Sequence, residues 1–238
     1  MLIGKDFDKI EFDFFGLDLL EPNAFIGDTI ILIVALYFAV QIKKFKLRNP
    51  FFKNWKRFYI VFGIGFFLGG IGHTFYNYFG LTGKYPSWYS GILSTLFVEQ
   101  AMFSLITNQK LKSIALKTSH FKALFVAIIA TFVFTYINLK DDVSKGLIVP
   151  TLNSVIGLGF SLGFLGYHFS KTIHPSFKWL WISALILIPS AIIQAMKINI
   201  APWMDRNDLS HVLLILGMFC YFITIKNYSK QLKSTTVP

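Results

Sequence analysis

The sequence predicts an all-α integral membrane protein, a seven-helix bundle with its N-terminus outside and its C-terminus in the cytoplasm. Three observations support this prediction. Apolar residues make up 54% of the 238-residue chain, more than a typical soluble domain contains. Apolar runs of close to twenty residues recur, and each is long enough to cross roughly 30 Å of hydrocarbon as a helix. Basic residues concentrate in alternate connections between these runs.

Seven apolar runs are predicted to span the membrane. They occupy residues 24–42, 58–79, 88–107, 121–138, 149–169, 177–196 and 208–225. The connections are short, so consecutive helices are expected to lie antiparallel within one domain, residues 24–225. An acidic extracytoplasmic segment, residues 1–23, precedes this domain, and a basic cytoplasmic tail, residues 226–238, follows it. The first segment lacks the basic start of a signal peptide, so the first apolar run is expected to direct insertion.

The distribution of positive charge determines the predicted orientation. Sixteen of the 23 Lys and Arg residues fall on one side of the predicted spans, and seven fall on the other. The sixteen are Lys43, Lys44, Lys46, Arg48, Lys53, Lys56, Arg57, Lys110, Lys112, Lys117, Lys122, Lys171, Lys178, Lys226, Lys230 and Lys233. The face richer in Lys and Arg is normally cytoplasmic, so this face is assigned to the cytoplasm. The net charge of +11 therefore indicates a membrane surface and argues against a nucleic-acid partner.

Several polar residues fall inside the predicted spans. Four of them lie 15 or 16 residues from the basic residue that marks the inner end of their span: Asp28, His73, Gln194 and His211. At about 1.5 Å per helical residue, they share a layer roughly 22–24 Å above that boundary. Asn77 and Asn153 approach the same height, and Glu99 lies one to two turns deeper. Because ionisable groups are costly in hydrocarbon, this layer predicts a polar pocket in the outer half of the bundle.

The two histidines of this layer suggest a metal centre. Two imidazoles and a carboxylate can hold zinc, and a water molecule on such a zinc is an activated nucleophile. His73 and His211 are therefore candidate zinc ligands. Asn207, Asp208 or Glu99 would complete the ligand set, and Glu99 is also a candidate base. The alternative is that the polar groups hydrogen-bond to one another and only fix the positions of the helices.

Three segments carry a resemblance to known membrane proteins. Leu-Asp-Leu-Leu-Glu-Pro-Asn-Ala-Phe-Ile-Gly-Asp ends at Asp28, and in Gly-His-Thr-Phe-Tyr-Asn-Tyr the residue Tyr78 follows His73 by five positions. Asn-Asp-Leu-Ser-His-Val-Leu contains His211, and Gly217 follows this histidine by six positions. These segments resemble the superfamily of seven-span membrane proteins that includes alkaline ceramidases and adiponectin-type receptors. Glu-Pro-x5-Asp and Asn-Asp-Leu-x-His also resemble a family of uncharacterised bacterial membrane proteins.

The first resemblance implies a zinc-dependent hydrolase with His73 and His211 as zinc ligands. It also implies a calcium site near four residues of the first segment, Asp18, Glu21, Asn23 and Asp28. The sequence departs from the superfamily at Gly69, where the superfamily has a serine, and at Asn207, where it has the first histidine of a pair. A three-histidine zinc site is therefore not encoded. The second resemblance implies a location in the bacterial cytoplasmic membrane.

The sequence leaves two functions open. The first is a membrane-embedded, metal-dependent hydrolase of a lipid amide or ester, in which Asp28 and Glu21 orient groups or bind calcium. The second is a non-enzymatic binding or sensing protein that receives a small polar ligand or a lipid head group. In either case Glu21, Asn77, Asn153 and Gln194 are expected to contribute to the pocket. Membrane lipid is the expected partner, and the oligomeric state is open.

Two cofactor proteins are less consistent with the sequence. A di-haem electron carrier would use His73 with His211 and His120 with His168, but no predicted span carries two histidines stacked on one face. A retinal protein needs a lysine for a Schiff base, and the seventh span has none before Lys226 at its inner end.

Overall fold

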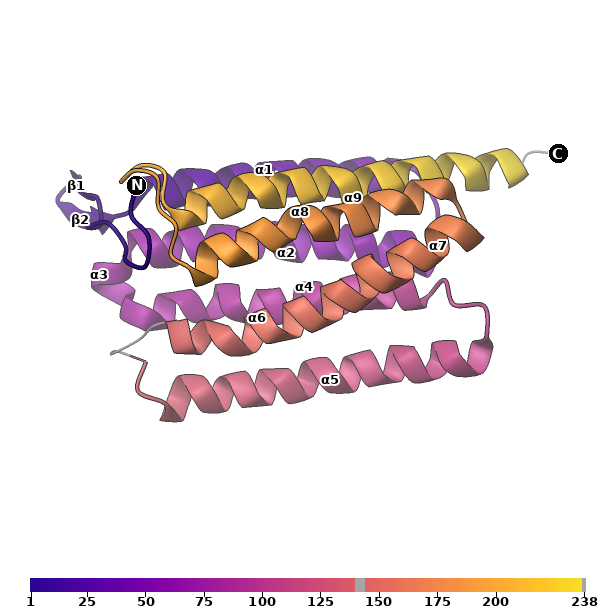
Figure 1. Cartoon of the computed structure of the whole chain (residues 1–238), viewed down its shortest axis with the longest axis horizontal. Coiled ribbons are helices and arrows are strands. Elements are labelled where there is room, and N and C mark those ends of the chain that lie inside the picture. Colours follow the sequence, from indigo (N-terminus) through magenta and orange to yellow (C-terminus); the bar gives the residue numbers. More distant parts are fainter. Residues whose placement is uncertain (140–143, 237–238) are drawn as a thin grey trace.

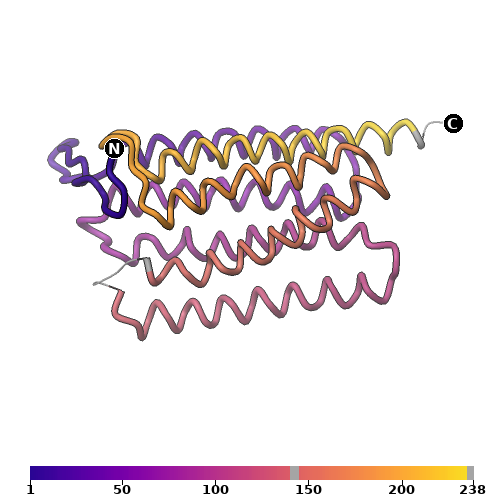
Figure 2. Tube along the Cα trace, in the orientation of Figure 1, coloured from indigo at the N-terminus to yellow at the C-terminus, as the bar shows by residue number. Residues whose placement is uncertain are grey.

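The computed structural model describes residues 1–139 and 144–236. Its long helices lie along one axis, and the chain passes back and forth between the two ends of an elongated bundle (Figures 1 and 2). The helices are α1 (Pro22–Lys44), α2 (Pro50–Thr74), α3 (Tyr76–Phe79), α4 (Tyr85–Phe103), α5 (Gln109–Tyr136), α6 (Ser144–Leu158), α7 (Gly166–Thr172), α8 (Lys178–Ala195) and α9 (Arg206–Thr236). The predicted all-α class is confirmed.

Short elements complete the connections. The turns η1 (Gly80–Lys84) and η3 (Pro175–Phe177) are 3₁₀ helices, and η2 (Gly159–Leu165) is a π-helical segment that joins α6 to α7. A two-stranded antiparallel hairpin, β1 (Glu11–Phe14) and β2 (Leu17–Leu20), precedes α1. The sequence analysis did not predict this hairpin. We call the end of the bundle that holds it the hairpin end and the opposite end, where α1 and α9 finish, the basic end (Figure 1).

The helices have the length and composition of a multi-pass membrane protein. Among the described residues, five helical stretches are long and apolar enough to cross a membrane: Pro22–Lys44, Gln109–Tyr136, Lys145–Thr172, Pro175–Ala195 and Arg206–Ser234. A sixth candidate is formed by Pro50–Thr74 together with Tyr76–Phe103, which meet at a bend of 82°. Large apolar side chains also face outward along these helices, for example Ile33, Phe121 and Ile156, each more than 60% exposed. Such a surface is expected to face lipid.

Three helix boundaries differ most from the prediction. Helix α2 begins at Pro50 because the side chain of Asn49 accepts a hydrogen bond from the backbone of Phe51. Helix α5 begins at Gln109, since the side chain of Asn108 caps it in the same way. Helix α9 continues past the predicted end of its span to Thr236. Three lysines predicted to precede the fourth span, Lys110, Lys112 and Lys117, therefore lie on α5. Hydropathy marks only the apolar part of a helix, whereas the capping side chain determines the residue at which the helix begins.

The core lies between α1, α2, α4, α8 and α9. Phe38 of α1 stacks on Phe222 of α9, with ring centroids 4.4 Å apart. The hydroxyl of Tyr59, on α2, donates a hydrogen bond of 2.8 Å to the carbonyl of Met218 on α9. Helix α5 lies at the edge of the bundle and packs against α4 and α6 (Figure 1). The described bundle therefore has a dense side and a peripheral helix.

Glycines allow close contacts between α2 and its neighbours. A Cβ atom at Gly63 would lie 2.8 Å from the Cβ of Ala35 on α1. A Cβ atom at Gly72 would lie 2.4 Å from the carbonyl oxygen of Gly83, in the connection to α4. Small residues commonly permit such approaches between helices in membranes. The neighbour of Gly72 is backbone, which cannot move aside as a flexible side chain can.

We predict that Gly72→Ala destabilises the protein by about 1–3 kcal/mol, because the added methyl group overpacks the contact with Gly83. The matched control is Gly91→Ala on α4, where a Cβ atom meets nothing within 4 Å. That change should stabilise the helix by up to about 1 kcal/mol. Thermal unfolding of the purified variants in detergent measures both effects. Equal unfolding temperatures for the two variants would contradict the close approach at Gly72.

Candidate functional site

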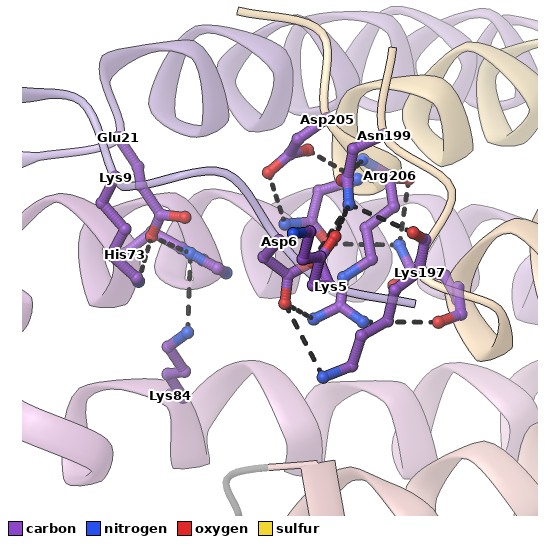
Figure 3. A network of polar contacts seen from close by, with 12 residues as sticks. Lys5, Asp6, Lys9, Glu21, His73, Lys84, Lys197, Asn199, Asp205 and Arg206 are labelled. Carbon is purple, nitrogen blue, oxygen red and sulfur yellow. Dashed lines mark hydrogen bonds and ion pairs between the residues drawn. The ribbon is translucent and has the colours of Figure 1, made fainter. Parts of the chain in front are cut away.

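The N-terminal segment is bound to the hairpin end of the bundle. Leu2 and Asn199, in the connection between α8 and α9, exchange two backbone hydrogen bonds of 2.8 Å. Asp6 accepts a hydrogen bond of 3.1 Å from the guanidinium of Arg206, the first residue of α9 (Figure 3). The side-chain amide of Asn199 donates to the carbonyl of Lys5 at 2.9 Å. Hydrogen bonds therefore hold the first residues of the chain against the start of α9 and the connection before it.

Glu21 connects this segment to α2. Its carboxylate is buried, and Oε2 lies 2.8 Å from Nζ of Lys9 and 2.8 Å from Nδ1 of His73 (Figure 3). The Nζ atom of Lys84, just before α4, lies 3.5 Å from the same His73 nitrogen. The backbone of Glu21 has φ 50°, a left-handed conformation that costs roughly 1 kcal/mol for a residue with a Cβ atom. The ionic contacts of its side chain offset this cost.

The surroundings of Glu21 keep it ionised. Burial alone raises the pKa of this carboxyl, but the hydrogen bonds and positive charges of His73 and Lys9 outweigh that effect and lower the pKa to about 2, from a usual 4.5. A carboxyl group with such a low pKa carries no proton at neutral pH. Glu21 is therefore a fixed anion that orients His73, and it is not a proton donor.

A second carboxylate and imidazole meet deeper in the bundle. Oδ1 of Asp28, on α1, lies 3.3 Å from Nε2 of His211 on α9, without hydrogen-bond geometry. Gly70 makes room for this carboxylate, since a Cβ atom there would lie 3.0 Å from the Cβ of Asp28. Gly27 does the same for the imidazole, because its Cβ atom would lie 2.8 Å from Nδ1 of His211. Two glycines thus allow the pair to form.

The start of α9 carries a further polar cluster. Asp205 caps the helix by accepting hydrogen bonds from the backbone of Asn207, at 2.6 Å, and of Asp208, at 3.1 Å. The side chain of Asp208 accepts a hydrogen bond of 2.8 Å from the amide of Asn23 on α1. Gln194 of α8 donates to the side chain of Asn207 at 3.1 Å. Asn207 and Asp208 therefore connect α9 to its neighbours.

A groove of about 310 Å³ lies between α1 and α9. Ten residues line it: Asn23, Ile26, Gly27, Ile30, Trp203, Met204, Asp208, His211, Val212 and Ile215. The two helices run in parallel, and the polar residues of both lie at the hairpin end of the groove. The isoleucines Ile30 and Ile215 lie further along both helices. Ile26, Trp203 and Val212 are each more than half exposed, so the groove opens on the apolar outer surface.

Glu99 belongs to a different polar group. It forms an ion pair with Lys122 of α5, and Gly157 of α6 packs against both side chains. Asn153, one turn before Gly157, is 6% exposed. The structure therefore brings Glu99 and Asn153 to the junction of α4, α5 and α6, while the two histidines face other carboxylates.

Comparison with protein families shows the family to which the chain belongs. A model described as a family of unknown function, DUF6962, matches residues 24–230. The chain belongs to this family. The match runs from the start of α1 almost to the end of α9, so it covers the whole helical bundle. No curated protein and no solved structure matches the chain.

In this DUF6962 member the residues of the expected metal sites lie against separate partners. In the part of the chain that the structure describes, no three His, Cys, Asp or Glu side chains gather as metal ligands. His73 faces Glu21 and His211 faces Asp28, although the two imidazoles are close enough to interact electrostatically. The four residues expected at calcium also have separate partners: Asp18 pairs with Asn77, Glu21 with His73, Asn23 with Asp208, and Asp28 with His211.

The basic residues that contact the site and the N-terminal segment of this family member were not predicted from the sequence. Lys9, Lys84 and Arg206 were not candidates, yet each contacts a predicted site or the N-terminal segment. Lys122 was counted with the cytoplasmic charges although it lies within the predicted span 121–138, and its ion pair with Glu99 was not predicted. Asn77, expected one turn beyond His73 on the same helix, lies on α3 because α2 ends at Thr74.

We predict that Glu21 makes the stability of the protein depend on acid pH. Its folded-state pKa is depressed, so its contribution is fully present above pH 4.5 and is lost as pH falls toward 2. The contribution at neutral pH is up to about 3 kcal/mol. Glu21→Gln should therefore be less stable at pH 6 and should lose less stability on acidification. Denaturant unfolding between these pH values measures it, with Glu11→Gln on the exposed hairpin as control. Parallel pH profiles for wild type and Glu21→Gln would overturn the assignment.

Proposed function

We propose that the chain crosses the membrane seven times, with the hairpin end outside and the basic end in the cytoplasm. The lengths of α2 and α4 support separate crossings, since their 25 and 19 residues extend roughly 37 and 28 Å. The two helices also pack side by side along the bundle (Figure 1). The connections at the basic end contain no Asp or Glu, while Lys and Arg are concentrated there. That asymmetry supports a cytoplasmic basic end.

Cysteine labelling tests this topology, with Cys220 replaced by Ser. We predict that a membrane-impermeant maleimide labels Asp13→Cys, in the hairpin, on intact cells. Arg48→Cys, before α2, and Thr107→Cys, after α4, should both react only after permeabilisation. If α2 and α4 formed one bent span, positions 48 and 107 would lie on opposite sides. Labelling of Thr107→Cys alone on intact cells would therefore contradict the proposal.

We propose further that the groove between α1 and α9 binds an amphiphile from the outer leaflet. The observation that carries this proposal is the order of residues along the groove. Asn23 and Asp208 lie at its hairpin end, Gly27 and His211 follow, and the apolar pair Ile30 and Ile215 continue toward the bilayer centre. A lipid has the same order, a polar head at the interface and an acyl chain below it.

The chemistry of the groove favours one kind of head group. The carboxylate of Asp208 and the side-chain amide of Asn23, which are hydrogen-bonded to each other, line the polar end, and Asp28 lies behind His211. These groups accept hydrogen bonds and attract positive charge, so an amine, amide or hydroxyl head group fits better than a bare phosphate. An exposed opening along Ile26 and Val212 lets a lipid enter sideways from the bilayer.

A bulky substitution inside the groove tests the binding. We predict that phosphatidylethanolamine raises the unfolding temperature of the purified protein in detergent, with a chelator present, by mass action. Ile30→Trp fills the groove and should weaken the apparent affinity about tenfold or more, roughly 1.4 kcal/mol. Ile33→Trp is the control, since Ile33 lies on the same helix with 61% exposure and does not line the groove. Equal stabilisation of both variants would remove the groove as the binding site.

Hydrolysis of a lipid amide or ester at the same groove is the second candidate. His211 lines the groove and pairs with Asp28, which is the observation that favours it. The zinc-dependent form of this function needs a metal held by both His73 and His211. Equimolar zinc in purified protein, lost in His73→Ala and in His211→Ala, together with release of fatty acid, would favour the hydrolase. Lipid binding that persists after chelation, without release of product, favours the binding protein.

A further inference from the structure

We propose that the junction of α4, α5 and α6 is a binding site for a small monovalent cation, such as sodium, that competes with Lys122 for Glu99. This site is separate from the groove between α1 and α9, and it does not depend on the function proposed for that groove. The proposal rests on buried oxygen atoms that lack partners and on a basic side chain placed to compete for them.

The register of α4 against α6 places the oxygen atoms on adjacent turns of the two helices. A Cβ atom at Gly146 would lie 2.4 Å from the ring of Trp88, and one at Gly157 would lie 2.7 Å from Oε1 of Glu99. The second contact lies eleven residues further along both α4 and α6 than the first. The two helices therefore run in parallel and keep the same register between these contacts. Asn153, between the two glycines on the same face, is therefore level with Thr95.

The donors at this level suit a hard cation. Glu99 is 4% exposed, and its Oε2 atom has no hydrogen-bond partner among the described residues. In the same part of the chain neither polar atom of Asn153 has one. The hydroxyls of Thr95 and Ser154 lie 3.0 Å apart between the same two helices. One carboxylate with neutral oxygen atoms is the ligand type of hard cations, and a single negative charge matches a monovalent ion.

Lys122 would compete with a bound cation for the carboxylate of Glu99. Its ammonium group contacts Oε1 of Glu99 from α5, and its side chain is 28% exposed, so it has a route away from the carboxylate. Helix α5 packs against α4 and α6 at the edge of the bundle and turns a broad apolar face outward (Figure 1). Neutralisation of Glu99 by a free cation in place of Lys122 would loosen the contact of this peripheral helix.

The test measures thermal unfolding of purified protein while sodium, potassium or choline chloride is varied at constant total chloride. The wild type should gain a few degrees in unfolding temperature with sodium or potassium, saturably, and none with choline. Glu99→Gln should lose the response. Lys122→Met should bind the cation at least tenfold more tightly, because the tethered competitor is gone. Lys117→Met, which removes another lysine of α5, should behave as the wild type.

Asn153→Leu is a second variant that tests the site in case Glu99→Gln does not fold. It removes a neutral donor without changing the charge, so it should weaken the response about tenfold. An equal response in the wild type and in Asn153→Leu would overturn the site. The absence of any response in the wild type would overturn it too. A response confined to Lys122→Met would have the same consequence, because it would show that Lys122 alone neutralises Glu99 in the native protein.

Discussion

Matching each buried carboxylate with a basic group is the constraint on which this bundle depends. A lone ionised carboxylate in a low-dielectric interior costs several kcal/mol, and removing one partner of a buried pair is strongly destabilising. Glu21 meets His73, Asp28 meets His211, and Glu99 meets Lys122. Each pair joins segments that are distant in sequence. The pairs therefore help to determine which segments are neighbours. Contacts between uniformly apolar surfaces would not distinguish one neighbour from another.

Glycine positions make two of these pairs possible. Gly70 and Gly27 leave space beside Asp28 and His211, and Gly157 leaves space beside Glu99 and Lys122. A methyl group at Gly157 would lie 2.7 Å from Oε1 of Glu99, so even alanine would displace the ion pair. Small residues in membrane helices usually bring backbones together. In this bundle they also admit polar side chains between helices, which couples helix packing to the placement of charge.

The sequence predicted how deep the polar residues lie but not which way they point. Counting residues from a basic boundary gives the height of Asp28, His73 and His211 along the bundle, and the structure does pair two of these three. Direction around each helix axis depends on packing that hydropathy does not encode. The prediction therefore placed both histidines in one metal centre, whereas each faces its own carboxylate. The hairpin was not predicted, because strands of four residues are too short to show a clear alternation of apolar and polar residues.

The orientation of His211 is an argument for binding over hydrolysis in the groove proposed between α1 and α9. One ring nitrogen, Nε2, lies 3.3 Å from Oδ1 of Asp28, and the other, Nδ1, is buried beside Gly27 and has no hydrogen-bond partner among the described residues. The ring therefore contributes to the wall of the groove, but Nδ1 is buried and cannot reach a bound molecule unless the ring moves. A general base must reach the proton that it removes, at hydrogen-bonding distance or through one water. Hydrolysis would require this imidazole to leave Asp28, which would expose a buried carboxylate, whereas binding of an amphiphile leaves the pair intact.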